Sequence, residues 1–190
     1  MRPNILLKVP TITIAFICAL VGFLISCRYD PVEIPNPPSE ELYLKMERGG
    51  CYGRCPIYSL EISSDGRAKF DGKFFTKVNG KAESSIPHEN LKAIAAAIKS
   101  SDFFSLEDSY EVGSGNCPEL ATDLPEVVLY IKLDGREKTI KHYHGCFQKK
   151  DAPSSGNFNE LVFPQSLYLL ENKIDELAGS GKWVIEDKIK

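Results

Sequence analysis

The stretch VVLYIKLDGREKTIKHYH, residues 127–144, carries the clearest structural signal in the sequence. Apolar side chains alternate with other residues over 127–133, which is typical of a β-strand with one face in a hydrophobic core. Asp134-Gly135 then favours a tight two-residue turn. We therefore expect residues 136–144 to form the return strand of an antiparallel hairpin.

The same alternation occurs earlier in the chain. It covers residues 41–47 and 56–63, and Asp65-Gly66 marks a turn after the second of these segments. Further turn signals divide residues 68–86 into short segments. Together these segments predict a meander of antiparallel strands.

Two segments have the periodicity of helices, and each begins with a proline, Pro87 or Pro164, which the first turn of a helix accepts. The apolar residues at helical spacing are Leu91, Ile94 and Ile98 in the first segment and Leu167, Leu170, Ile174 and Leu177 in the second. The order is strands, helix, strands, helix. It predicts an α+β fold, in which two helices cover an antiparallel sheet of meander and hairpin strands in a single domain.

Composition limits the class of protein. The chain has 190 residues, of which 43% are hydrophobic and 26% are charged, as in ordinary globular proteins. Its 23 basic and 26 acidic residues give a formal net charge of -3, and no run of like charge is present. We therefore expect no nucleic-acid partner, because such binding depends on a positively charged surface.

The N-terminus has the pattern of an export signal. Residues 9–26 carry no charge and follow the basic residues Arg2 and Lys8. On length alone this stretch could span a membrane without being cleaved. However, Leu24-Ile25-Ser26-Cys27 resembles the lipobox of bacterial lipoproteins. This resemblance implies cleavage before Cys27 and attachment of a lipid to its thiol.

The predicted organisation is a lipoprotein signal peptide over 1–26, a lipidated cysteine with a Pro-rich tether over 27–39, and a globular domain over 40–190. The acyl chains on Cys27 would then be the membrane contact of an exported, lipid-anchored protein. Arg28 stands where an Asp would retain a lipoprotein in the inner membrane. By resemblance to Gram-negative sorting, the outer membrane is therefore favoured if the host has one.

The predicted domain contains four cysteines, Cys51, Cys55, Cys117 and Cys146. Outside the cytosol, an even number of cysteines predicts disulfide bonds. Four cysteines allow three connectivities, and the sequence alone does not choose among them. We favour Cys51 with Cys55, which a loop at Gly53 would permit, and Cys117 with Cys146, which both lie near one end of the predicted hairpin.

Several short strings resemble one known family. They are Cys51-Tyr52-Gly53-Arg54-Cys55-Pro56-Ile57-Tyr58, then Asp65-Gly66, Phe103-Phe104-Ser105-Leu106 and Thr122-Asp123-Leu124-Pro125. Together they are similar to the bacterial family catalogued as domain of unknown function 6438, whose members are largely exported proteins or lipoproteins. The resemblance implies a fold and a location. It implies no catalytic residue and no cofactor.

Two chemical alternatives remain open. A thiol redox site could use Cys51 and Cys55, although a redox pair commonly lies at a helix N-terminus and a strand is predicted here. A metal could be bound by His142, His144 and Cys146, which alternate on one side of a predicted strand.

We therefore expect a cell-envelope lipoprotein that acts as a non-enzymatic binding or structural module, with an envelope protein or glycan as its partner. The sequence assigns it no catalytic residue, metal or cofactor. An exported thiol-redox or metal-dependent enzyme that uses the residues above is the alternative.

Overall fold

The computed structural model describes residues 41–148, 159 and 161–184. The expected signal peptide, lipidated Cys27 and tether lie outside these residues. Within the described part of the chain, no helix is long and apolar enough to cross a membrane.

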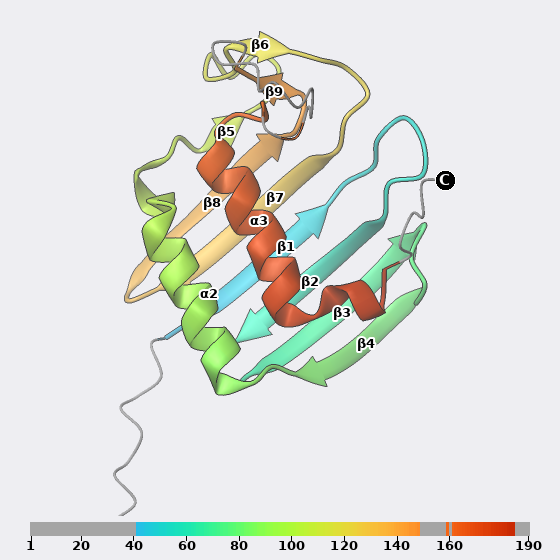
Figure 1. Ribbon diagram of the computed structural model, residues 1–190, viewed down its shortest axis with the longest axis vertical. Coiled ribbons are helices and arrows are strands. Elements are labelled where there is room, and N and C mark those ends of the chain that lie inside the picture. Colours follow the sequence, from blue (N-terminus) through green and yellow to red (C-terminus); the bar gives the residue numbers. More distant parts are fainter. Residues whose placement is uncertain (1–40, 149–158, 160, 185–190) are drawn as a thin grey trace, which may run out of the picture. The chain divides into compact units, whose positions relative to one another are not determined.

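A seven-stranded sheet forms the centre of the fold, with the strand order β4-β3-β2-β1-β7-β8-β5 (Figure 1). The strands are β1 (Tyr43–Arg48), β2 (Ile57–Ser63), β3 (Arg67–Phe74), β4 (Gly80–Ser85), β5 (Ser109–Tyr110), β7 (Glu126–Leu133) and β8 (Arg136–Tyr143). The expected meander and hairpin are therefore present. β1 joins them, because it pairs with β2 on one side and with β7 on the other.

Two helices cover one face of this sheet, α2 (His88–Ser100) and α3 (Gln165–Ala178) (Figure 1). Their apolar sides meet the buried side chains of the strands, which alternate as the sequence predicts. The amide of Asn90 in α2 donates a hydrogen bond to the carbonyl of Leu177 in α3. The two helices and the sheet confirm the predicted α+β fold.

The sheet departs from a purely antiparallel arrangement at one edge. β5 pairs with β8 in parallel over two residues, where the sequence shows no alternation of apolar residues. A separate two-stranded sheet pairs β6 (Glu119–Leu120), from the segment between β5 and β7, with β9 (Cys146–Phe147), which follows β8. Both pairings are too short to produce an alternation that could be recognised in the sequence.

The C-terminal part of the domain returns to the core. After the short helix η3 (Ser180–Lys182), the ring of Trp183 stacks on Phe70 of β3 with centroids 5.1 Å apart. The neighbouring Val184 forms an isolated bridge with Thr76. These contacts attach the residues after α3 to β3 and to the residues that follow β3.

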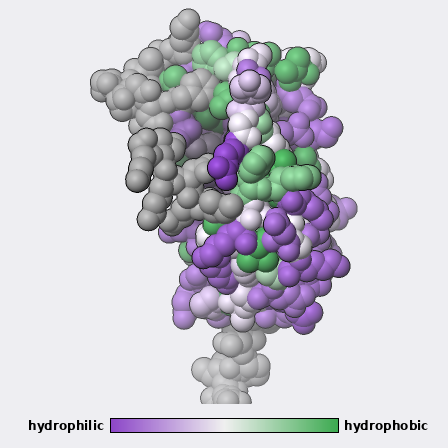
Figure 2. Space-filling model, turned by 90° about the vertical axis from the view of Figure 1, so that its right-hand side faces the viewer, coloured by the Kyte–Doolittle hydropathy of each residue, from purple (hydrophilic) through white to green (hydrophobic). Residues whose placement is uncertain are grey.

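No helix of the described residues covers the opposite face of the sheet. This face carries many charged side chains, such as Lys45 and Glu61, which lie opposite each other on β1 and β2. Viewed from the right-hand side of Figure 1, the surface is mostly hydrophilic, with small hydrophobic areas (Figure 2).

Candidate functional site

Two of the strings that carry the family resemblance, residues 51–58 and 122–125, come together at the end of the sheet opposite Asp65-Gly66. β1 ends and β2 begins there, and residues 49–56 connect them. The main-chain N–H of Tyr52 donates to the carbonyl of Asp123 over 3.1 Å, and that of Gly49 donates to the carbonyl of Glu126 over 2.7 Å. The loop between the first two cysteines is thereby attached to the segment that leads into β7.

Both expected cysteine pairs are present. Cys51 and Cys55 form a disulfide with their Cα atoms 5.6 Å apart, and Gly53 between them has a φ of 136°, which glycine adopts readily. Cys117 and Cys146 form the second disulfide, with Cα atoms 5.1 Å apart. The sulfur of Cys146 is therefore not a free thiolate. Cys146 cannot bind a metal together with His142 and His144, as the sequence pattern allowed.

The first disulfide closes a loop that is largely open to solvent. The side chain of Tyr52 is 88% exposed. The guanidinium carbon of Arg54, in the same loop, lies 5.8 Å from the centre of the Phe75 ring, and Phe74, next to Phe75 in the sequence, is 63% exposed. Aromatic and basic side chains thus surround the loop at the surface.

A buried cluster lies at the same end of the domain, under α3. Glu171 of α3 is fully buried and contacts both predicted histidines through different oxygens. Its Oε1 is 2.8 Å from Nδ1 of His142, and its Oε2 is 2.7 Å from Nε2 of His144. The structure therefore brings His142 and His144 together, as expected, but with a carboxylate from the helix in place of Cys146.

Burial and hydrogen bonding act in opposite directions on Glu171. Burial alone would raise the pKa of its carboxyl group, but the hydrogen bonds with His142 and His144 outweigh burial and lower this pKa to about 2. Burial also lowers the pKa of His144, against the effect of its hydrogen bond with Glu171. At neutral pH Glu171 is therefore ionised and His144 is neutral.

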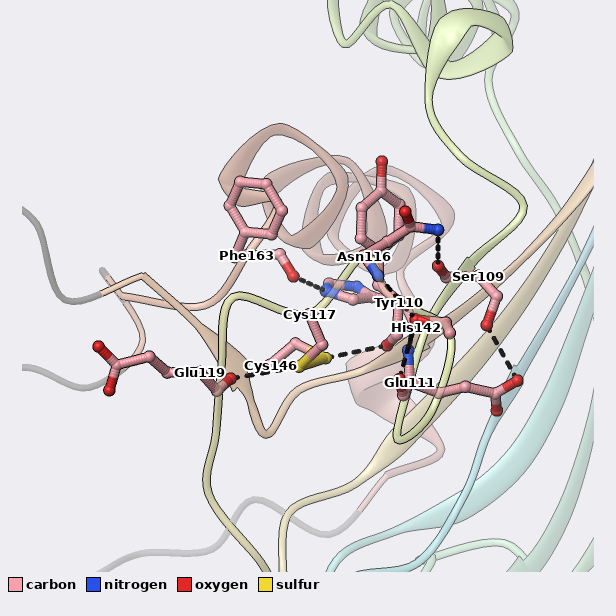
Figure 3. Close-up of a disulfide and its surroundings, with 10 residues drawn as sticks. Ser109, Tyr110, Glu111, Asn116, Cys117, Glu119, His142, Cys146 and Phe163 are labelled. Carbon is pink, nitrogen blue, oxygen red and sulfur yellow. Dashed lines mark hydrogen bonds between the residues drawn. A yellow bond between two sulfur atoms is a disulfide. The ribbon is translucent and has the colours of Figure 1, made fainter.

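The second disulfide lies next to this cluster. Figure 3 shows it beside Tyr110 and His142, and the rings of these two residues are 6.2 Å apart. Cys146 follows His144 by two residues and its side chain is also buried. The disulfide thus fixes the chain immediately after the two histidines.

A second carboxylate of α3, Asp175, stands one helical turn after Glu171 and also faces the sheet. It accepts a hydrogen bond of 2.7 Å from Nε of Arg48 and one of 2.8 Å from the hydroxyl of Tyr58. Burial and the nearby charge of Asp175 raise the pKa of Tyr58, so its hydroxyl remains protonated and donates. α3 is therefore held to the sheet by the buried carboxylate of Glu171 and the partly buried carboxylate of Asp175 as well as by apolar contacts.

Sequence reasoning missed Glu171 and Asp175. A signal for Glu171 does exist, because it lies four residues after Leu167 and three before Ile174, which are on the apolar side of the helix. A carboxylate at such a position needs a buried partner. The pattern could therefore have indicated a polar contact, although not the residues that make it.

The fold and this site define a class of protein: an α+β domain with two disulfides, in which buried polar side chains attach one helix to a largely antiparallel sheet. The model of the family described as Domain of unknown function (DUF6438) matches residues 42–178, and the chain belongs to this family. No curated protein matches the sequence. The family's description assigns no activity, so the function has to be argued from the site.

Proposed function

We propose that this protein is a lipid-anchored cell-envelope protein whose domain is a non-enzymatic binding module. The lipobox-like residues 24–27 and the proline-rich segment after them support anchoring by a lipid and a tether. The partner that fits the exposed residues best is another protein of the envelope.

The observation that carries this proposal is the exposure of Tyr52 in a covalently closed loop. An 88% exposed tyrosine gains nothing from the fold of its own chain, whereas tyrosine and arginine are enriched among residues that dominate protein interfaces. The disulfide and the hydrogen bond to Asp123 hold the loop before any partner arrives. Such a loop loses less conformational freedom on binding than a flexible one, which favours affinity.

The chemistry of the domain supports binding rather than catalysis. His142 and Glu171 are both 0% exposed, so they lie out of reach of a substrate in solution. The pair of Cys51 and Cys55 precedes a β-strand, and therefore lacks the helix N-terminus that commonly stabilises a reactive thiolate.

The test places a photo-crosslinking amino acid at position 52 of the full-length protein in growing cells. Val112, which is 68% exposed in another loop, is the control position. We expect a crosslinked envelope protein from position 52 and none from position 112. A crosslink only to glycan, equal crosslinks from both positions, or none from either would contradict the proposal.

A further inference from the structure

The buried cluster places three metal-binding side chains around one point. One ligand atom from each of His142, His144 and Glu171 lies within 4.8 Å of the other two, and all three residues are buried. They come from two separate parts of the chain, the end of β8 and the middle of α3. Their convergence is therefore a property of the packed domain.

The surroundings of His142 determine which of its nitrogens carries a proton. Its Nε2 lies 3.2 Å from the carbonyl oxygen of Phe163. A carbonyl oxygen only accepts hydrogen bonds, so a hydrogen bond at this contact places the hydrogen of a neutral imidazole on Nε2. Nδ1 of that imidazole then has a free electron pair, which points at the carboxylate of Glu171 at 2.8 Å.

Two electron-pair donors at this distance need a cation between them. A hydrogen on Nδ1 of His142 or a metal ion can take this place. A metal-ligating histidine usually donates its other ring N–H to a backbone carbonyl or a carboxylate, as His142 does to Phe163. Two imidazoles and one carboxylate are also a donor set that zinc accepts.

We propose that His142, His144 and Glu171 bind one zinc ion between the sheet and α3. Three protein ligands leave one position of a tetrahedral ion for a water molecule. The ion would join α3 to the end of β8, beside the disulfide that fixes Cys146. Because the ligands come from β8 and α3 and the cluster is buried, binding of zinc to the folded domain would stabilise the fold.

The test uses the full-length protein extracted from membranes in detergent. It is unfolded in urea with a chelator while its disulfides stay intact, and it is then refolded with or without Zn²⁺. We expect about one zinc per chain after removal of unbound metal, and a higher melting temperature than without zinc. Co²⁺ in place of zinc should give the visible absorption bands of a tetrahedral site with nitrogen and oxygen ligands.

Two variants of α3 locate the ion. Glu171→Gln should lose the bound zinc, while Glu176→Gln, which changes an exposed carboxylate in the same helix, should retain it. If Glu171→Gln does not refold, the zinc content and melting temperature of the unmodified protein still test the proposal. Refolding to the same melting temperature with no bound zinc would assign the cation to a proton on His142 and overturn the proposal. Equal zinc in both variants would show binding elsewhere and would also overturn it.

Discussion

The guanidinium of Arg48 lies 2.7 Å from the carboxylate of Asp175, although 127 residues separate them in the sequence. Their side chains are only 14% and 17% exposed. Burial alone would lower the pKa of Arg48, but the charges of Asp175 and Glu171, the nearby Tyr58 and the hydrogen bond with Asp175 together outweigh burial and raise this pKa, so the arginine stays charged. This ion pair positions α3 against β1, at the level where Tyr58 also donates to Asp175.

We expect Asp175→Ala to lower the free energy of unfolding by about 3 kcal/mol, because it leaves a largely buried charge on Arg48 without its partner. The hydroxyl of Tyr58 loses its acceptor as well. Urea denaturation followed by circular dichroism measures the change. Glu176→Ala is the matched control, since the carboxylate of Glu176 is exposed, and a loss within about 0.5 kcal/mol is expected there. Equal losses from the two variants would show that the ion pair of Arg48 and Asp175 adds nothing to the free energy of unfolding beyond what an exposed carboxylate adds.

The two disulfides should differ in their effect on stability. Cys117 and Cys146 are 29 residues apart, whereas Cys51 and Cys55 are 4 apart. In the chain-entropy description, the longer loop stabilises the fold by about 4 kcal/mol and the shorter by about 2 kcal/mol. Replacing each pair by alanines and comparing melting temperatures tests this order. A larger loss from the shorter loop would indicate that native contacts outweigh chain entropy.

Gly145→Ala should destabilise the domain by about 2 kcal/mol or more. An added Cβ would collide with the carbonyl of Ala121 and with the ring of Tyr143, so the turn between β8 and β9 would have to shift. Thermal unfolding of the purified variant measures the loss. Gly181→Ala is the control, because a Cβ at that glycine meets nothing within 4 Å. A neutral Gly145→Ala would show that the turn adapts without cost.

The lipid anchor gives a prediction that depends on one sulfur atom. Peptide mass spectrometry of protein extracted from its native membrane should find a diacylglyceryl group on Cys27 at a new N-terminus. Cys27→Ala should abolish this modification and the cleavage before it. Cys18→Ala, which changes the other cysteine of the N-terminal segment, should alter neither. An unmodified Cys27 in the mature protein would remove the basis for a lipid tether.

Local patterns in the sequence predict most of the secondary structure. Alternation over 127–133 predicted β7, and Leu167, Leu170 and Ile174 predicted the buried side of α3, because side-chain periodicity reflects the contact of each element with the core. The favoured disulfide pairs are also present, although the sequence alone allowed three connectivities and only placed Cys117 and Cys146 near the same end of the predicted hairpin.

Which distant elements lie side by side depends on how the whole chain packs. The position of β1 between β2 and β7 brings Arg48 opposite Tyr58, and no local pattern specifies such a neighbour. The packing of α3 on the sheet then brings Glu171 to the two histidines and Asp175 to Arg48. Periodicity shows that a side chain faces inward, but its partner depends on how whole elements pack, which is a long-range property of the chain.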